Sequence, residues 1–304
     1  MRKVRATRRA GAALALAAAL AVLVPACGAV QSAPPATAVD PALHERLPPD
    51  VLERGVVRVA TDASHRPLSS FDADGRRVVG FAPDLLAELG RLMGVRFELV
   101  VVPPRQVLAG LPERMGEGDS GGTGIPRFDV ALTTAGAPAA AGLHADVVPF
   151  LATPTSLLVQ RHTIVGVTDL DDLCGFVVAV ERDTAQVDVL REAALDCGEQ
   201  GIRVEEFPSN ADALLQLRTR QADALVTDHA QAAHLMTNPR TRSHYRVMDT
   251  APELPVVFGV AVPPSDFRFR DLLTDALAEL DERGTYDRLL RRWHLSEAVL
   301  ADEG

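Results

Sequence analysis

The sequence predicts an α/β protein made of two lobes, each with a mostly parallel sheet. Short runs of β-branched residues alternate with amphipathic helical stretches, and this alternation occurs in two successive blocks. Repeated β-α-β units of this kind build parallel sheets. The length of 304 residues allows two domains, at about 150 residues for each domain.

The first block supplies three strands and two helices. We expect strands at 56–61, 95–102 and 128–133, because each segment is rich in valine, leucine or phenylalanine. The helical periodicity predicts helices at 83–93 and 106–114 between them.

The second block repeats this order. Strands are expected at 176–180, 202–207 and 222–227, and helices at 184–195, 210–219 and 229–236. After the second block we expect a strand at 258–262 and one long amphipathic helix at 269–290.

Composition and charge exclude several classes of protein. A hydrophobic content of 47% with 24% charged residues is typical of a chain that buries a core, which excludes disorder and collagen-like repeats. The net charge is −10, and the first 26 residues contain basic but no acidic residues, so the remainder is still more acidic. Nucleic acid is therefore not an expected partner.

The N-terminus has the features of an export signal. Five basic residues precede an apolar run at 10–24, and small residues follow it. The segment 24–27 resembles a bacterial lipobox, so residues 1–26 are expected to be a lipoprotein signal peptide and Cys27 the lipidated residue. The Pro-rich stretch 27–50 then suits a tether. An ordinary secretory signal with a chance cysteine is the alternative.

Two cysteines remain, Cys174 and Cys197. In an exported chain an even remainder indicates a disulfide, whereas two unpaired thiols in the core are the alternative.

Polar residues follow the predicted strands where a ligand site is expected. Ligands of open α/β sheets bind beyond the carboxyl ends of the strands. These ends carry Asp62 and His65, then Thr133 and Thr134, then the stretch 181–184 that leads into a helix, and finally Asp228. We expect a cleft between the lobes that holds a small polar molecule.

The sequence resembles the extracellular solute-binding proteins of family 3, which deliver amino acids and other small polar solutes to ABC importers. Six segments in order carry the resemblance: 57–62 (VRVATD), 80–85 (GFAPDL), 127–130 (RFDV), 178–180 (VAV) with Thr184, 222–228 (ADALVTD) and 284–293 (GTYDRLLRRW). The resemblance extends from about residue 52 to 295.

The resemblance implies an architecture and a set of partners. It implies the type II fold of periplasmic binding proteins, with two crossover strands near 153–155 and 252–255. Lobe 1 would comprise 51–153 and 256–304, and lobe 2 would comprise 154–255. The chain would be a monomer, lipid-anchored on the extracellular side of the cell membrane, with an ABC permease as its partner and no cofactor.

The resemblance also implies residue roles. Asp228 matches the carboxylate that takes the α-ammonium of the ligand, and Thr184 matches the hydroxyl at a helix N-terminus that helps to hold its carboxylate. Thr133, Thr134 and Gly136 match the small polar stretch beside the ligand. Alternatively, Asp228 and Thr184 only cap their helices.

Two departures from the family pattern bear on the ligand. His65 stands where the family often has an aromatic ring, and Pro104 stands near a second such position. No arginine lies near 139–141, where the family grips the α-carboxylate. We therefore expect a cationic or neutral polar ligand, with Arg105 as the one substitute for the missing arginine. His65 is a ligand contact or a solvated residue at the edge of the cleft.

Other motifs lack the context that their chemistry needs. The segment 118–122 (GDSGG) matches the nucleophile motif of chymotrypsin-like proteases, but the residues before it predict an α/β fold rather than a β-barrel. His229 and His234 are five residues apart and do not share a helix face as a metal-binding pair does. We expect neither a metal site nor catalytic residues, and Trp293 is expected to pack.

The function expected from these observations is that of a substrate-binding lipoprotein of an ABC importer, which captures an amino-acid-like or amine-containing solute by hinge closure. Two alternatives stay open. One is a dehydratase-like enzyme on the same fold, with His65 or Asp62 as the general acid or base. The other is a solute sensor without transport.

Overall fold

The computed structural model describes residues 38–115, 128–134, 144–163, 167, 170–248 and 255–295. They belong to one compact unit that begins at Thr37. Several predicted features lie outside the described residues: the signal peptide with Cys27, the segment 118–122, Gly136, the alanines at 139–141 and most of the crossover at 252–255.

The first lobe contains the parallel strands that the sequence predicts. Strand β1 (Val56–Thr61) lies between β5 (Arg96–Val101) and β6 (Val130–Thr134) and pairs in parallel with both. The helices of this block are α3 (Phe81–Met93) and α4 (Pro104–Ala109). Helix α4 is shorter than expected, because it ends at Gly110 rather than continuing to residue 114.

The second lobe repeats the pattern. Strand β8 (Val177–Glu181) pairs in parallel with β9 (Arg203–Phe207) and β10 (Ala224–Asp228). Helices α6 (Ala185–Asp196), α7 (Asn210–Thr219) and α8 (His229–Thr237) connect or follow these strands. Helix α7 begins and ends at the expected residues, and the Ser209 hydroxyl caps it by accepting from the Asp212 N–H.

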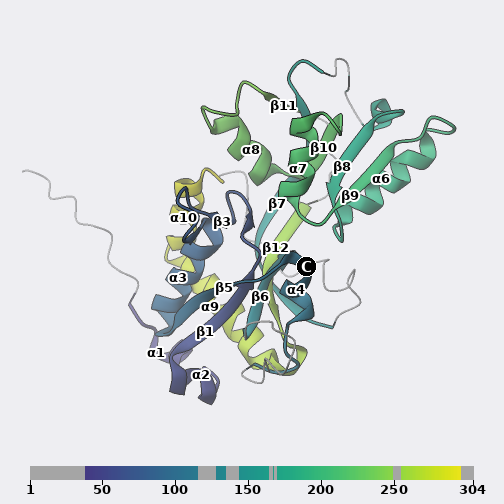
Figure 1. Ribbon diagram of the computed structural model, residues 1–304. Coiled ribbons are helices and arrows are strands. Elements are labelled where there is room, and N and C mark those ends of the chain that lie inside the picture. The colour runs from purple at the N-terminus through teal and green to yellow at the C-terminus, as the bar shows by residue number, and fades with distance from the viewer. Residues whose placement is uncertain are drawn as a thin grey trace, which may run out of the picture. The chain divides into compact units, whose positions relative to one another are not determined.

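The crossover strand that the resemblance implied near 153–155 joins the two sheets and is longer than expected. Strand β7 (Asp146–Gln160) pairs antiparallel with β12 (Pro255–Val262) up to Pro154, and with β10 from Thr155 onward. Its last part also pairs with β11 (Tyr245–Met248). The resulting order is β5-β1-β6-β12-β7-β10-β8-β9, and β7 and β12 run between the two halves in Figure 1. The change of partner falls at Pro154, which has no N–H for a ladder.

Short elements complete the described structure. A small antiparallel sheet of β2 (Ser64–His65), β3 (Ser69–Phe71) and β4 (Val78–Val79) follows β1. The remaining elements are α1 (Pro41–His44), α2 (Pro49–Arg54), η1 (Asp171–Leu173) and η2 (Pro264–Asp266). Strands of two or three residues are too short to produce a hydrophobic period, and the sequence did not predict them.

The expected single helix at 269–290 is wrong, because the structure has two helices there. Helix α9 (Phe267–Glu282) ends before Gly284, and α10 (Thr285–Trp293) begins after it. Gly284 has φ of +64°, a left-handed conformation that ends a helix and favours glycine. The hydrophobic periodicity continues on both sides of this break, which is why the pattern suggested one helix.

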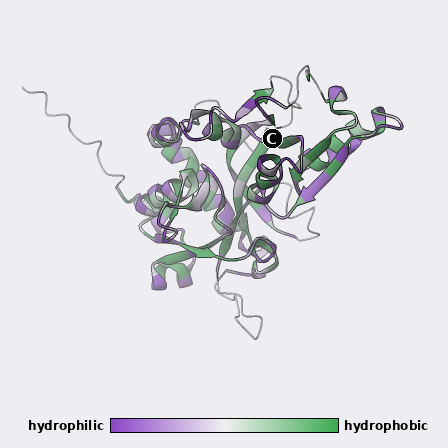
Figure 2. Ribbon diagram, turned by 45° about the horizontal axis from the view of Figure 1, so that its top comes forward, coloured by the Kyte–Doolittle hydropathy of each residue, from purple (hydrophilic) through white to green (hydrophobic). Residues whose placement is uncertain are grey.

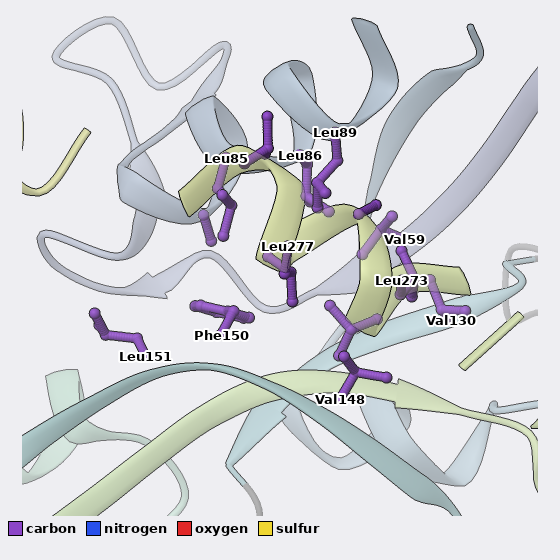
Figure 3. Packing of buried hydrophobic residues seen from close by; sticks show 14 of the residues in the cluster. Val59, Leu85, Leu86, Leu89, Val130, Val148, Phe150, Leu151, Leu273 and Leu277 are labelled. Atoms are coloured by element: carbon purple, nitrogen blue, oxygen red, sulfur yellow. The ribbon is translucent and has the colours of Figure 1, made fainter. Parts of the chain in front are cut away.

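The main core lies between the first sheet and helices α3, α9 and α10. Figure 3 shows Leu85 and Leu89 of α3 close to Leu273 and Leu277 of α9. All four are almost fully buried. The Tyr286 hydroxyl of α10 donates to the Phe150 carbonyl of β7 at 2.7 Å, which fastens the C-terminal helix to the crossover strand.

The second sheet is covered on both faces. One cluster includes Val178, Val180 and Leu190 on the α6 side, and another includes Ala179 and Leu225 with residues of α7 and α8. Strands buried on both faces are continuously hydrophobic rather than alternating. Figure 2 accordingly shows the central strands as largely hydrophobic.

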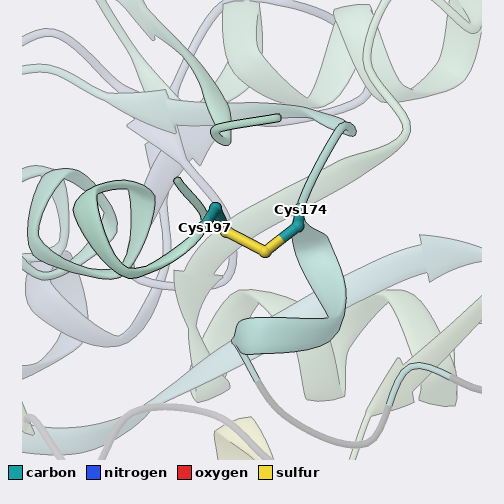
Figure 4. The surroundings of a disulfide bond; sticks show 2 residues. All are labelled: Cys174 and Cys197. Carbon is teal, nitrogen blue, oxygen red and sulfur yellow. A yellow bond between two sulfur atoms is a disulfide. The ribbon is translucent and has the colours of Figure 1, made fainter. Parts of the chain in front are cut away.

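The structure contains the predicted disulfide. The sulfur atoms of Cys174 and Cys197 are 2.05 Å apart, and the two Cα atoms are 5.4 Å apart. The bond ties the segment before β8 to the C-terminal cap of α6 (Figure 4).

No helix in the described part of the chain is long and apolar enough to span a bilayer.

Candidate functional site

A cavity of about 350 Å³ opens at the carboxyl ends of strands from both sheets. The ends of β1 and β6 contribute from the first lobe, and the ends of β8 and β10 contribute from the second. This is the place that the topology of open α/β sheets predicts. The six predicted ligand contacts within the described residues all line it: Asp62, His65, Thr133, Thr134, Thr184 and Asp228.

Asp228 is the last residue of β10 and only 1% exposed. Its Oδ1 accepts from the Gln231 N–H at 3.0 Å, so it caps α8 as the alternative interpretation held. Its Oδ2 lies on the side of the cavity, 2.6 Å from His65 Nε2 and 3.5 Å from Asn210 Nδ2. One carboxylate therefore serves both the helix and the cleft.

His65 lies between two carboxylates. Its Nε2 contacts Asp228, and its Nδ1 is 4.0 Å from Glu181 Oε2. Burial of the ring disfavours its charged form, but the charges of Asp228, Glu181 and Asp62 together outweigh that effect. They raise the pKa of His65 to about 9. The imidazole is therefore protonated at neutral pH.

Glu181 is the last residue of β8. Burial raises its pKa to about 7, and this effect is larger than the opposing attraction of the His65 imidazolium. The same imidazolium outweighs burial at Asp228 and lowers the pKa of that carboxyl. The two acids thus differ in charge near neutrality although they contact one imidazole.

Asp62 follows β1 and adds a third carboxylate to the cavity. Its Oδ1 accepts from the Ser64 N–H at 3.2 Å and its Oδ2 from the Ser64 hydroxyl at 2.5 Å. Three acids from both lobes therefore lie around one imidazolium in the cavity.

The hydroxyl groups predicted for the site are also present. Thr133 and Thr134 end β6, and both are half-buried. Thr184 is the N-cap residue of α6, but its hydroxyl donates to the Glu181 carbonyl at 2.8 Å rather than capping the helix. The positive end of α6 therefore lies beside the cavity next to Glu181.

Two arginines line the mouth of the cavity in the described part of the chain. Arg105 is in the first turn of α4, and Arg182 is in the turn after β8; both are exposed. Arg105 was the substitute considered from the sequence for the missing carboxylate-binding arginine.

One wall of the cavity is an aromatic side chain, Phe258, that the sequence did not predict as a site residue. The Phe258 ring of β12 packs edge-on against the His65 ring, with centroids 5.1 Å apart. Phe258 and Glu181 both line the cavity. Glu181 could be predicted as a site residue, because it stands at the end of a predicted strand. Nothing near Phe258 in the sequence places it beside His65.

The other features considered from the sequence lie elsewhere. Trp293 packs against the main core, and its indole N–H donates to Asp84. His229 Nδ1 is 3.2 Å from the Ser156 hydroxyl. Among the described residues no group of histidines, cysteines and acids has the arrangement of a metal site.

Comparisons with known proteins find relatives in sequence and in fold. No protein-family model matches the chain. The L-cystine-binding protein TcyJ of Escherichia coli is 24% identical over 249 residues, which cover 80% of this chain and 84% of that protein. An ancestral arginine-binding protein bound to glutamine superimposes with a TM-score of 0.63 at 23% identity, covering 80% of this chain and 99% of the other.

The chain has the two-lobed fold of amino acid-binding proteins. A lysine complex of a binding component of an ABC transporter from Wolinella succinogenes has a TM-score of 0.63 at 23% identity, over 79% of this chain and 96% of that one. These relatives confirm the resemblance to the family 3 solute-binding proteins. The fold also occurs in an ancestral amino acid-binding protein described as a precursor of cyclohexadienyl dehydratase.

Proposed function

We propose that the chain is the substrate-binding protein of an ABC importer, and that it captures a small cationic or neutral solute that carries an amine. The observation that carries this proposal is the cavity in which Asp62, Glu181 and Asp228 stand together at the ends of strands from both lobes. A carboxylate that ends a strand and has one oxygen toward the cavity is suited to receive an ammonium group.

The charges of the cavity argue against an acidic ligand. A carboxylate placed beside Asp62, Glu181 and Asp228 would be repelled, and an unpaired buried charge costs several kcal/mol. The two arginines of the described cavity wall stand at its exposed mouth. Among the described residues, an α-carboxylate could pair with a guanidinium at that mouth.

The relatives support a ligand with an amine. One of them binds L-cystine, and the solved structures include complexes with glutamine and lysine. All three molecules carry an α-ammonium group. The cavity described here has the carboxylates for that group.

A matched pair of ligands tests the proposal. L-Lysine and cadaverine share the same amines and differ in the α-carboxylate. We expect calorimetry to detect binding of cadaverine or lysine, and Asp228→Asn to weaken it about 30-fold or more, since loss of one partner of a buried charge pair costs about 2 kcal/mol or more. The control is Asp74→Asn, in an exposed turn. Tight binding of glutamate that Asp228→Asn leaves unchanged would contradict the proposal.

We further propose closure about β7 and β12, with 51–153 and 256–304 as lobe 1 and 154–255 as lobe 2. The support is the change of strand partner between Pro154 and Thr155. Only a closed state brings Asp62 and Asp228 to one ligand. Small-angle scattering is expected to show compaction when ligand saturates the protein; an unchanged radius of gyration would contradict closure.

Anchoring is a separate part of the proposal. The apolar run before Cys27 supports lipidation at that residue, which would place the protein on the extracellular face of the membrane as a monomer beside its permease. Two acyl chains suffice for stable anchoring. Cys27→Ala is expected to release the protein into the medium, and a variant that remains membrane-bound with unchanged mass contradicts the lipid anchor.

We infer that the solute is bound and not converted. The structural relatives support this, because they are binding proteins, although one is described as a precursor of a dehydratase. Incubation with cyclic carboxylic acids is expected to yield no product. Turnover that depends on His65 would instead assign the cavity to an enzyme.

A further inference from the structure

The position suited to the ammonium of a ligand is occupied by a side chain of the protein itself. His65 Nε2 donates to Asp228 Oδ2 at 2.6 Å, and the same oxygen is 3.5 Å from the Asn210 amide. Asp228 is the acid that the proposed function assigns to the ammonium. A cationic ligand and the imidazole ring therefore compete for one carboxylate oxygen.

We propose that His65 is an internal occupant of the cation position, and that a cationic ligand binds by displacing it from Asp228 with release of one proton to solvent. This inference rests on the proposed function, since it names how that same cavity exchanges one cation for another.

The geometry makes the contact a bridge between the lobes. His65 belongs to β2, next to the first sheet, and Asp228 ends β10 of the second sheet, 163 residues later. On its other side His65 Nδ1 is within 4.0 Å of Glu181 at the end of β8. The imidazole thus contacts the second lobe at the position that a ligand would take.

The surroundings of His65 contain acids on three elements. Asp62 follows β1, Glu181 ends β8 and Asp228 ends β10, and all three favour the protonated ring. Helix α7, which packs against β2, begins with the neutral Asn210, and Phe258 of β12 covers the ring edge-on. The neighbouring Arg66 turns away and donates to the Phe71 carbonyl. Arg105 and Arg182 are exposed at the mouth.

These charges explain why His65 would release a proton when a cation binds. An ammonium group on Asp228 would stand beside the displaced imidazolium, and the attraction that kept the ring charged would be shared with the ligand. The pKa of His65, about 9 without ligand, must fall in the complex. Because the free protein then holds more protons than the complex, affinity for a cation rises with pH. For release of one proton, the affinity for the cation can rise by at most about tenfold per pH unit. This rise ends near pH 9, where His65 of the free protein loses its proton.

The first test needs no ligand. NMR titration of the His65 imidazole in the ligand-free protein is expected to show a pKa well above 6.5, the ordinary value for an imidazole; the exposed His162 provides a reference signal. In Asp228→Asn the pKa of His65 is expected to fall, because the largest charge that raises it is gone. Asparagine also caps helices, so the start of α8 is retained. A His65 that titrates near 6.5 in both proteins would overturn the inference, whatever the ligand is.

The second test uses cadaverine as the probe. Calorimetry in buffers of different ionisation enthalpy is expected to show release of about one proton per cadaverine at pH 7.5. His65→Gln is expected to bind at least tenfold more tightly at pH 6 and to lose one unit of slope in log affinity against pH. The slope that remains is that of Glu181, whose pKa of about 7 lies in the same range. His162→Gln is the matched control.

The outcomes separate the two proposals. An equal slope in wild type and His65→Gln overturns the exchange and leaves the ligand class intact. A lack of cadaverine and lysine binding in both proteins overturns the ligand class, and displacement with it, while the ligand-free titration still reports on the ion pair between His65 and Asp228.

Discussion

The main core and the cleft are neighbours with opposite chemistry. Phe150 of β7 belongs to both: it packs into the core against Phe81, and it also lines the cavity. The core holds apolar side chains that are almost fully buried, whereas the cavity a few residues away brings Asp62, His65, Glu181 and Asp228 together. The core is packed for a single state, whereas the cleft holds carboxylates that His65 or a cationic ligand can pair with.

Removal of side-chain volume from the core is expected to have the largest effect. Leu89→Ala should lower the free energy of unfolding by about 2–5 kcal/mol, because Leu89 is 1% exposed between α3 and α9. Ligand affinity below the melting temperature should not change. Leu195→Ala is the control, since that side chain is 81% exposed. Urea denaturation measures both, and equal effects at the two sites would contradict this account of the core.

The disulfide is expected to contribute about 3 kcal/mol, by the entropy of a loop of this length. Cys174 and Cys197 are 23 residues apart and lie beside the cluster under α6. The double variant Cys174→Ser with Cys197→Ser should unfold at lower urea concentration and bind ligand with unchanged affinity. Loss of binding in the folded variant would show that the bond also positions the cleft.

The titratable groups of the cleft are expected to make the free energy of unfolding depend on pH. The pKa of His65 is raised to about 9 from an unfolded value near 6.5. Its stabilisation is therefore complete below pH 6.5 and disappears as the pH rises through 9, a loss on the order of 3 kcal/mol. Glu181 acts in the same direction, because its raised pKa makes the folded state lose stability between about pH 4.5 and 7.

Two variants are expected to separate the contributions of His65 and Glu181 to the pH dependence of stability. His65→Gln should remove the upper part of the decline, and Glu181→Gln should remove the lower part; chemical denaturation at closely spaced pH values resolves the two. The profile of the Leu89→Ala variant should be parallel to that of the wild type, because no titrating group is involved. A decline that survives in His65→Gln would place its origin outside the cleft.

The sequence predicted the elements that have a strong local signal. The strands of both β-α-β blocks and helix α7 follow from hydrophobic periodicity and capping. Only the resemblance placed a strand near 153–155, because β7 is buried on both faces along much of its length and contains Pro149 and Pro154, which interrupt a strand pattern. The break at Gly284 was missed because the apolar stripe continues across it.

The candidate site likewise contains residues that the sequence could predict and residues that it could not. Asp62, Thr134 and Asp228 could be predicted, because each follows a parallel strand and the topology brings such ends together. The contact between His65 and Asp228 could not, because it depends on how two lobes approach across 163 residues. Phe258 likewise enters the cavity from a crossover strand that carries no site signal in the sequence.

The central claim is that the cleft holds a ligand with an amine through Asp228. Mass spectrometry of the small molecules that co-purify with the native protein tests it most directly. We predict a bound molecule that carries an amine and no net negative charge, retained by the wild type and lost from Asp228→Asn. A dicarboxylate such as glutamate, retained equally by both proteins, would contradict the account.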